Sequence, residues 1–153
     1  MTVLLLILHG LIGVALLGAI THQATAVLRG QAHRRPGILH RYAAVDRPLF
    51  TGIVALLFVS NVCLGAVIYP RYRLDVRVPF EEMQLGWAIG LFEIKEHFAG
   101  IGLATVPVYL QSWRTDSGSD SDSVRRAFTL LMAFVIWWDF LTGHVINNLR
   151  GLT

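Results

Sequence analysis

The chain has 153 residues, of which 54% are hydrophobic and only 15% charged, with a formal net charge of +3. Soluble domains average about 25% charged residues, so this composition excludes an ordinary soluble protein and indicates one that lies in lipid. Cys63 is the only cysteine, which excludes an internal disulfide and a site built from several thiolates. The basic residues form no run interleaved with aromatics, so we expect no nucleic-acid partner.

Four apolar segments are long enough to cross a bilayer as helices, since one span needs about 20 apolar residues. They cover residues 3–28, 49–69, 85–113 and 127–149, with Pro70 expected to end the second and Pro107 to kink the third. Backbone groups in lipid must be paired within a helix or a closed barrel, and these runs are too long for barrel strands. We therefore predict one all-α integral membrane domain over residues 1–153, a four-helix transmembrane bundle that is multi-pass in an inner or plasma membrane.

The loops between these segments predict the topology. The first segment lacks a basic leader and a small-residue cleavage site, so we expect a retained span rather than a cleaved signal peptide. The loops at 29–49 and 114–126 carry eight arginines against four at the opposite ends, which predicts cytoplasmic loops and both termini on the outer side. Residues 115–123 are typical of a flexible polar linker. Residues 69–82 mix aromatic, basic and acidic side chains, compatible with an interfacial anchor or a short ordered cap.

Polar side chains recur within all four segments. At about 1.5 Å of helix rise per residue, the depths of these side chains below the outer ends of the segments range from about 8 Å to about 18 Å. The deepest two, Glu96 and His97, would lie near the bilayer midplane. A central charge facing lipid costs about 2.5–3.5 kcal/mol. We therefore expect these groups to converge on one internal pocket in the outer half of the membrane. In order of depth they are His9 and His144, then Asn61, Glu93 and Asp139, then Glu96 and His97.

Ideal helix geometry assigns faces to these groups. At about 100° per residue, Glu93 and His97 share one face of the third segment, while Lys95 points well away from His97. Small residues on that face would let a neighbouring helix or a flat cofactor come close. They are Gly86, Gly90, Gly100 and Ala104.

Histidines on different helices at matching depth indicate a b-type haem, whose iron takes axial imidazoles between the helices of a bundle. The preferred axial pair is His9 and His144, and His97 is an alternative to either. Lys95 would act as a counter-charge to a haem propionate or to Glu96. This pattern predicts a small electron-transfer subunit of cytochrome b character, without a soluble catalytic domain of its own.

Proton and quinone handling fits the same pocket, since intramembrane carboxylates are the usual relay groups. Glu93, Glu96 and Asp139 are the candidate proton carriers. Three tryptophans near the same depth are candidates to line a quinone headgroup pocket: Trp87, Trp137 and Trp138.

Two other functions remain open from the sequence. A non-haem iron, manganese or zinc site would use Glu93 and His97 at i, i+4, completed by Asp139, His144 and His9. In the other, the polar cluster only fixes helix packing or forms a proton path in an accessory subunit. In either case the expected partners are the lipid bilayer and other membrane subunits or further copies of the chain.

Overall fold

The computed structural model describes residues 2–29, 47–114 and 119–150, and these are helical except at residues 83–85. Four long helices dominate: α1 (Thr2–Arg29), α3 (Arg47–Tyr72), α5 (Gly86–Arg114) and α6 (Ser119–Arg150). Two short elements, the π-helical η1 (Arg73–Arg77) and α4 (Val78–Glu82), follow α3 directly. The predicted all-α class is confirmed for the described residues.

Three helical runs are long and apolar enough to cross a membrane: Val3–Leu28, Leu49–Glu82 and Ser121–Leu149. α5 has 29 residues but is not among these described runs. Its apolar sequence is interrupted by Glu93, Lys95 and Glu96. Length and composition therefore support three crossings, consistent with a membrane protein, and a fourth long helix whose apolar sequence is interrupted by charges.

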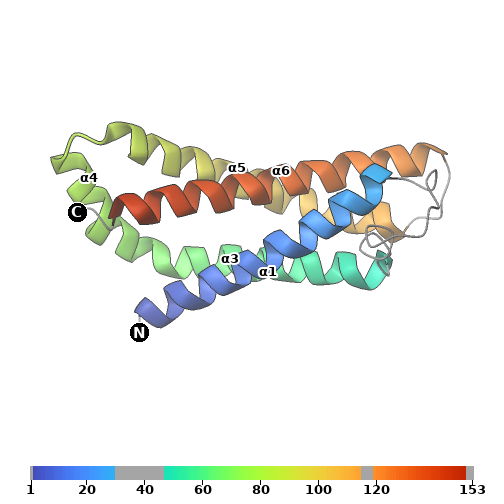
Figure 1. Ribbon diagram of the computed structural model, residues 1–153, viewed down its shortest axis with the longest axis horizontal. Coiled ribbons are helices and arrows are strands. Elements are labelled where there is room, and N and C mark those ends of the chain that lie inside the picture. The colour runs from blue at the N-terminus through green and yellow to red at the C-terminus, as the bar shows by residue number, and fades with distance from the viewer. Residues whose placement is uncertain (1, 30–46, 115–118, 151–153) are drawn as a thin grey trace.

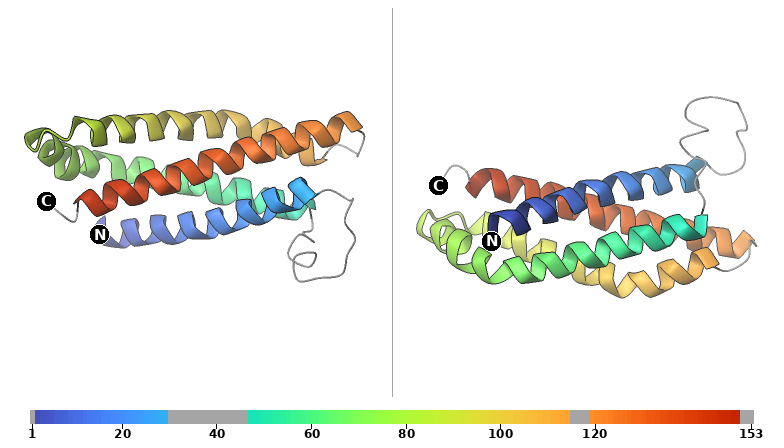
Figure 2. Two further views of the ribbon diagram at one scale, coloured as in Figure 1. Left: turned by 45° about the horizontal axis from the view of Figure 1, so that its top comes forward. Right: turned by 90° about the horizontal axis from the view of Figure 1, so that it is seen from below.

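The long helices lie side by side along the long axis of the molecule (Figures 1 and 2). α1 packs against α3 and α6, and α5 packs against the same two helices, so the four form a closed ring. α1 begins and α6 ends at the end of the molecule that carries α4 (Figure 1). This arrangement brings the N-terminal part of α1 beside the C-terminal part of α6.

Two helix boundaries differ from those expected from the sequence. Pro70 does not end the second helix: the chain stays helical to Glu82, with a π-helical turn over Arg73–Arg77 just after the proline. A π turn takes up an extra residue in the helix, so helical winding continues past the proline. Pro79 lies in the first turn of α4, where its missing N–H is tolerated.

The second difference is the start of α6, where residues 119–123 of the expected linker are helical. Asp122 accepts a hydrogen bond of 2.9 Å from Arg125 one turn later. An acidic side chain is also favourable near a helix N-terminus. Residues 115–118 of the expected linker, and residues 30–46 of the Arg-rich loop, lie outside the described residues.

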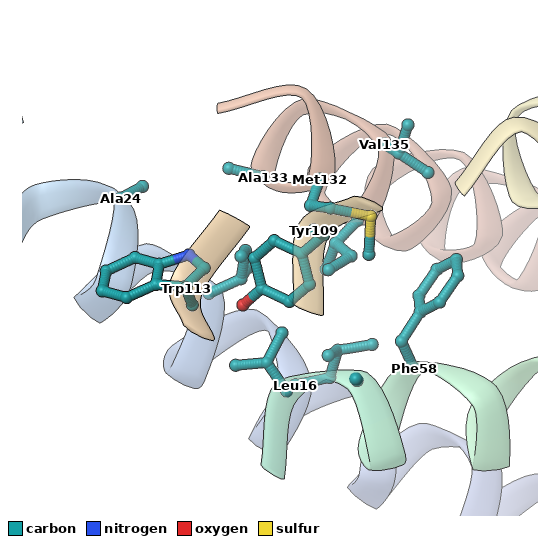
Figure 3. Packing of buried hydrophobic residues seen from close by; sticks show 12 residues of the cluster. Leu16, Ala24, Phe58, Tyr109, Trp113, Met132, Ala133 and Val135 are labelled. Carbon is teal, nitrogen blue, oxygen red and sulfur yellow. The ribbon is translucent and has the colours of Figure 1, made fainter. Parts of the chain in front are cut away.

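A buried apolar cluster joins all four long helices over the half of the molecule away from α4. Tyr109 of α5 projects into it between Leu16 of α1 and Met132 of α6 (Figure 3). Phe58 of α3 and Val135 of α6 are also buried there. We call this set of residues the inner cluster.

Polar groups within the inner cluster are paired. The Tyr109 hydroxyl donates to the Gln23 side-chain oxygen. Gln23 in turn donates to the Thr51 hydroxyl at 2.8 Å, and Trp113 donates to Thr129 at 3.1 Å. Buried polar groups are normally satisfied in this way. These hydrogen bonds join neighbouring helices and favour one position of each helix along its axis.

A smaller apolar cluster lies at the other end, where η1 and α4 pack on α5 and α6. Its buried members are Val76, Phe80, Ala88 and Ile146. The turn into α5 uses Gln84 with a positive φ of 58°. Residues 69–82 thus form an ordered helical cap, which we call the outer cap.

Candidate functional site

A cavity of about 670 Å³ separates the inner cluster from the outer cap. Leu16, Phe58 and Ile136 of the inner cluster line it on one side. Val76 of the outer cap and Ile146 of α6, both in the smaller apolar cluster, line it on the other. Ligand pockets in proteins have volumes of about 300–1,000 Å³. The cavity is therefore large enough for a cofactor-sized molecule.

Every long helix contributes a polar side chain to this cavity. α1 contributes His9 and α3 contributes Asn61. The remaining groups come from α5 and α6. They are Lys95, Glu96, Asp139 and His144. The structure thus brings together most of the ionisable residues singled out in the sequence, between two layers of apolar side chains.

Glycines form much of the cavity wall. A Cβ atom added at Gly65 would lie 3.5 Å from His9 Cε1, and one added at Gly143 would lie 3.7 Å from Lys95 Cε. Gly10 and Gly100 also line the cavity, and a Cβ at either would meet nothing within 4 Å. The missing side chains leave a space with room for a flat ligand between the helices.

Several buried polar atoms at the cavity have no hydrogen-bond partner among the described residues. They are His9 Nδ1, Asn61 Oδ1, the Tyr72 hydroxyl and Asp139 Oδ1. A buried donor or acceptor left unpaired costs about 1–3 kcal/mol. These unpaired atoms contrast with the paired groups of the inner cluster. They are available for hydrogen bonds to a bound molecule.

Three of the charged side chains that line the cavity form no contact ion pair in the described part of the chain. Among the described residues, none of Lys95, Glu96 and Asp139 has an oppositely charged partner within 4.0 Å. The Lys95 ammonium lies 5.6 Å from the centroid of the Phe92 ring. Lys95 therefore offers a positive charge to an anionic group of a bound molecule.

Glu93 and His97 do not line the cavity, contrary to the expectation from ideal helix faces. Both side chains are exposed. Glu93 Oε1 lies 3.7 Å from Arg77 Nη1 of the outer cap, and His97 Nδ1 lies 2.7 Å from the Glu93 carbonyl of its own helix. α5 is rotated so that the half-buried Lys95 and the exposed Glu96 line the cavity. Glu93 and His97 lie on the outer side of the helix.

The tryptophans expected at a quinone pocket also lie away from the cavity. Trp137 donates a hydrogen bond of 3.0 Å to Thr21, Trp138 packs against Phe98 with ring centroids 5.5 Å apart, and Trp87 is exposed. The aromatic residues that do line the cavity are Tyr69, Tyr72, Phe92, Phe58 and Phe140.

Comparison with known proteins gives no family. No protein-family model, curated protein or solved structure matches the chain. The site must therefore be interpreted from its own chemistry.

A metal site formed by protein side chains alone has no ligand set in the described part of the chain, where no three His, Cys, Asp or Glu side chains are grouped to hold an ion. A haem needs only two axial groups from the protein, because the porphyrin supplies the rest. His9 and His144 line the cavity from neighbouring helices, whereas His97 lies outside it.

Sequence reasoning missed the part of the wall that comes from α3 and η1. Gly65 and Tyr72 lie one and three turns beyond Asn61 on α3, and both line the cavity. Their spacings of four and eleven residues from Asn61 place them on the same face of α3 and would have identified them. Arg71 and Asp75, which pair at 3.8 Å beside the cavity, were missed because Pro70 was expected to end the helix.

Proposed function

We propose that this chain is a small electron-transfer subunit that binds haem b in the cavity, with His9 and His144 as axial ligands. One observation carries the proposal: imidazoles from α1 and α6 line the same cavity of about 670 Å³. Haem iron is commonly held by axial histidines, and helix bundles build such sites in their interior. When bound, the haem supplies a reversible one-electron couple, and the protein holds and tunes it.

The residues around the cavity fit such a group. The glycine wall leaves space for a flat macrocycle, and apolar side chains cover the cavity on both sides. Two cationic side chains that propionates could engage line the cavity: Lys95, and Arg71, which is paired with Asp75 at 3.8 Å. Charge-assisted hydrogen bonds to carboxylates are about twice as strong as neutral ones, so these cations would contribute to both affinity and orientation.

Four crossings, with both termini on the outer side, complete the proposed arrangement. Tyr69, Tyr72 and Phe92 stack on one another, with 3.7 Å between the centroids of the Tyr72 and Phe92 rings. Aromatic belts of this kind lie at membrane interfaces. Lys95 follows Phe92 by about 5 Å of helix rise, so we propose that the cavity lies near the outer interface, in the outer half of the membrane.

A quinone headgroup is the second candidate ligand of the cavity. The Tyr72 hydroxyl is buried beside it without a partner, and the Tyr72 ring is stacked on Phe92. A phenol donor next to an aromatic surface suits a quinone carbonyl and ring. A quinol, or another membrane subunit, is also the proposed electron donor to the haem.

An absorption spectrum of the purified full-length protein tests the haem proposal directly. We expect a reduced-minus-oxidised difference band of a b-type haem, with one haem per chain. A colourless preparation that retains a metal ion would favour a non-haem site. A colourless and metal-free preparation that carries quinone would favour the second candidate, and one that carries neither would leave a structural role for the cluster.

Asp139 is the proposed proton carrier of the site. Reduction adds negative charge near its carboxylate, and a carboxylate in a low-dielectric site then takes up a proton. The midpoint potential should fall with rising pH, by up to about 59 mV per pH unit. Asp139→Asn should flatten this dependence, and Asp122→Asn, an exposed aspartate on the same helix, should not. An unchanged slope in Asp139→Asn would exclude this carboxylate as the carrier.

A further inference from the structure

His9 lies against α3 at Gly65, where that helix has no side chain. A Cβ added at Gly65 would lie 3.5 Å from His9 Cε1, so the imidazole packs on the backbone of α3. One turn away on both helices, the Asn61 amide approaches Gly13, with Nδ2 3.9 Å from an added Cβ. His9 and Gly13 are four residues apart on α1, as Asn61 and Gly65 are on α3, so the two polar side chains occupy one packed strip between the helices.

Within this strip, a donor and an acceptor are both buried and unsatisfied. His9 Nδ1 and Asn61 Oδ1 have no hydrogen-bond partner among the described residues. Each would cost about 1–3 kcal/mol if left unpaired. A hydrogen bond between these two atoms would satisfy both at once.

We propose that Asn61 is a positioning residue for His9: its side-chain oxygen accepts a hydrogen bond from His9 Nδ1–H and leaves Nε2 to face the cavity. Metal-ligating histidines usually donate their second ring N–H to such an acceptor, which fixes the tautomer and the ring orientation. The role in haem binding rests on the proposed function. The proposed hydrogen bond itself does not, because it joins two side chains of the protein and is tested without a ligand.

Haem titration of the full-length apoprotein tests the positioning role. Loss of a partner of this kind typically weakens metal affinity 10–100-fold, so we expect Asn61→Leu to raise the dissociation constant by about that factor. Asn61→Asp, which keeps an acceptor oxygen, should restore affinity. Asn148→Leu is the matched control, because Asn148 is an exposed asparagine of α6 that does not line the cavity, and it should bind haem like the unmodified protein.

Nitrogen-15 NMR of the His9 ring, in protein free of haem, separates this inference from the haem proposal. We expect the Nδ1–H tautomer in the unmodified protein and in Asn61→Asp, and its loss in Asn61→Leu. The same tautomer in all three proteins would overturn the positioning role, even if haem binds. If the unmodified protein binds no haem, the haem proposal fails, while the NMR comparison still decides whether Asn61 holds His9.

Discussion

Replacing His144 by alanine is expected to abolish the reduced-minus-oxidised haem band, and His9→Ala should do the same. Each variant removes one axial ligand, and the remaining imidazole cannot hold the iron from both sides. The measurement is the difference spectrum of the purified variant, with the amount of haem per chain determined separately. We expect at most a small residue of five-coordinate haem with an altered band position.

His97→Ala is the matched control for this experiment. His97 is a third histidine on the outer half of the helices, but it lies outside the cavity and its Nδ1 contacts the Glu93 carbonyl of its own helix. The variant should keep the full band and the same haem content. If His97→Ala loses haem while His144→Ala keeps it, the axial pair is not the one proposed, and α5 would have to be rotated relative to the structure.

The Glu93 and His97 assignment shows what sequence reasoning can and cannot predict in such a chain. Spans are predictable because hydrophobicity over about 20 residues reports burial in lipid, and α1, α3 and α6 were each recognised in this way. Rotation about a helix axis is not, since an error of one residue turns the helix by about 100°. Glycines at the face of Glu93 were taken to mark the interior, but additions at Gly86 and Gly90 would meet open space.

The second limit concerns segments where local rules compete with tertiary packing. Pro70 predicts a helix end, yet Val76 and Phe80 beyond it are buried against α5 and α6. Burial of these side chains stabilises a helical continuation that a single proline disfavours. The outer cap and the cavity wall that it forms are therefore stabilised by contacts between distant parts of the chain. Local sequence rules do not predict such contacts. The convergence of His9, Asp139 and Lys95 was predictable, because lipid disfavours each of them separately.

Gly102 is the most tightly packed of the four glycines on α5, which predicts a large effect of a substitution there on stability. An added Cβ would lie 2.5 Å from Phe58 Cζ and 3.1 Å from Val135 Cγ1. Both neighbours are buried in the inner cluster, and overpacking of a core costs about 1–3 kcal/mol. We therefore expect Gly102→Ala to lower the thermal unfolding midpoint of the detergent-solubilised protein. Gly90→Ala, with nothing within 4 Å of its added Cβ, should be neutral or stabilising through helix propensity.

Phe58 also lines the cavity, so the same substitution should affect ligand binding. The Phe58 ring must shift to relieve the clash, and we expect it to shift into the cavity that it lines. Gly102→Ala should therefore lower haem occupancy as well as stability, and Phe58→Leu in the same chain should recover part of both, because the shorter side chain removes the atom that clashes. Neighbouring residues coupled in this way show interaction energies of about 0.5–3 kcal/mol in a double-mutant cycle. Strictly additive effects would mean that α5 does not pack on Phe58 through Gly102, and the cavity floor would then need a different helix arrangement.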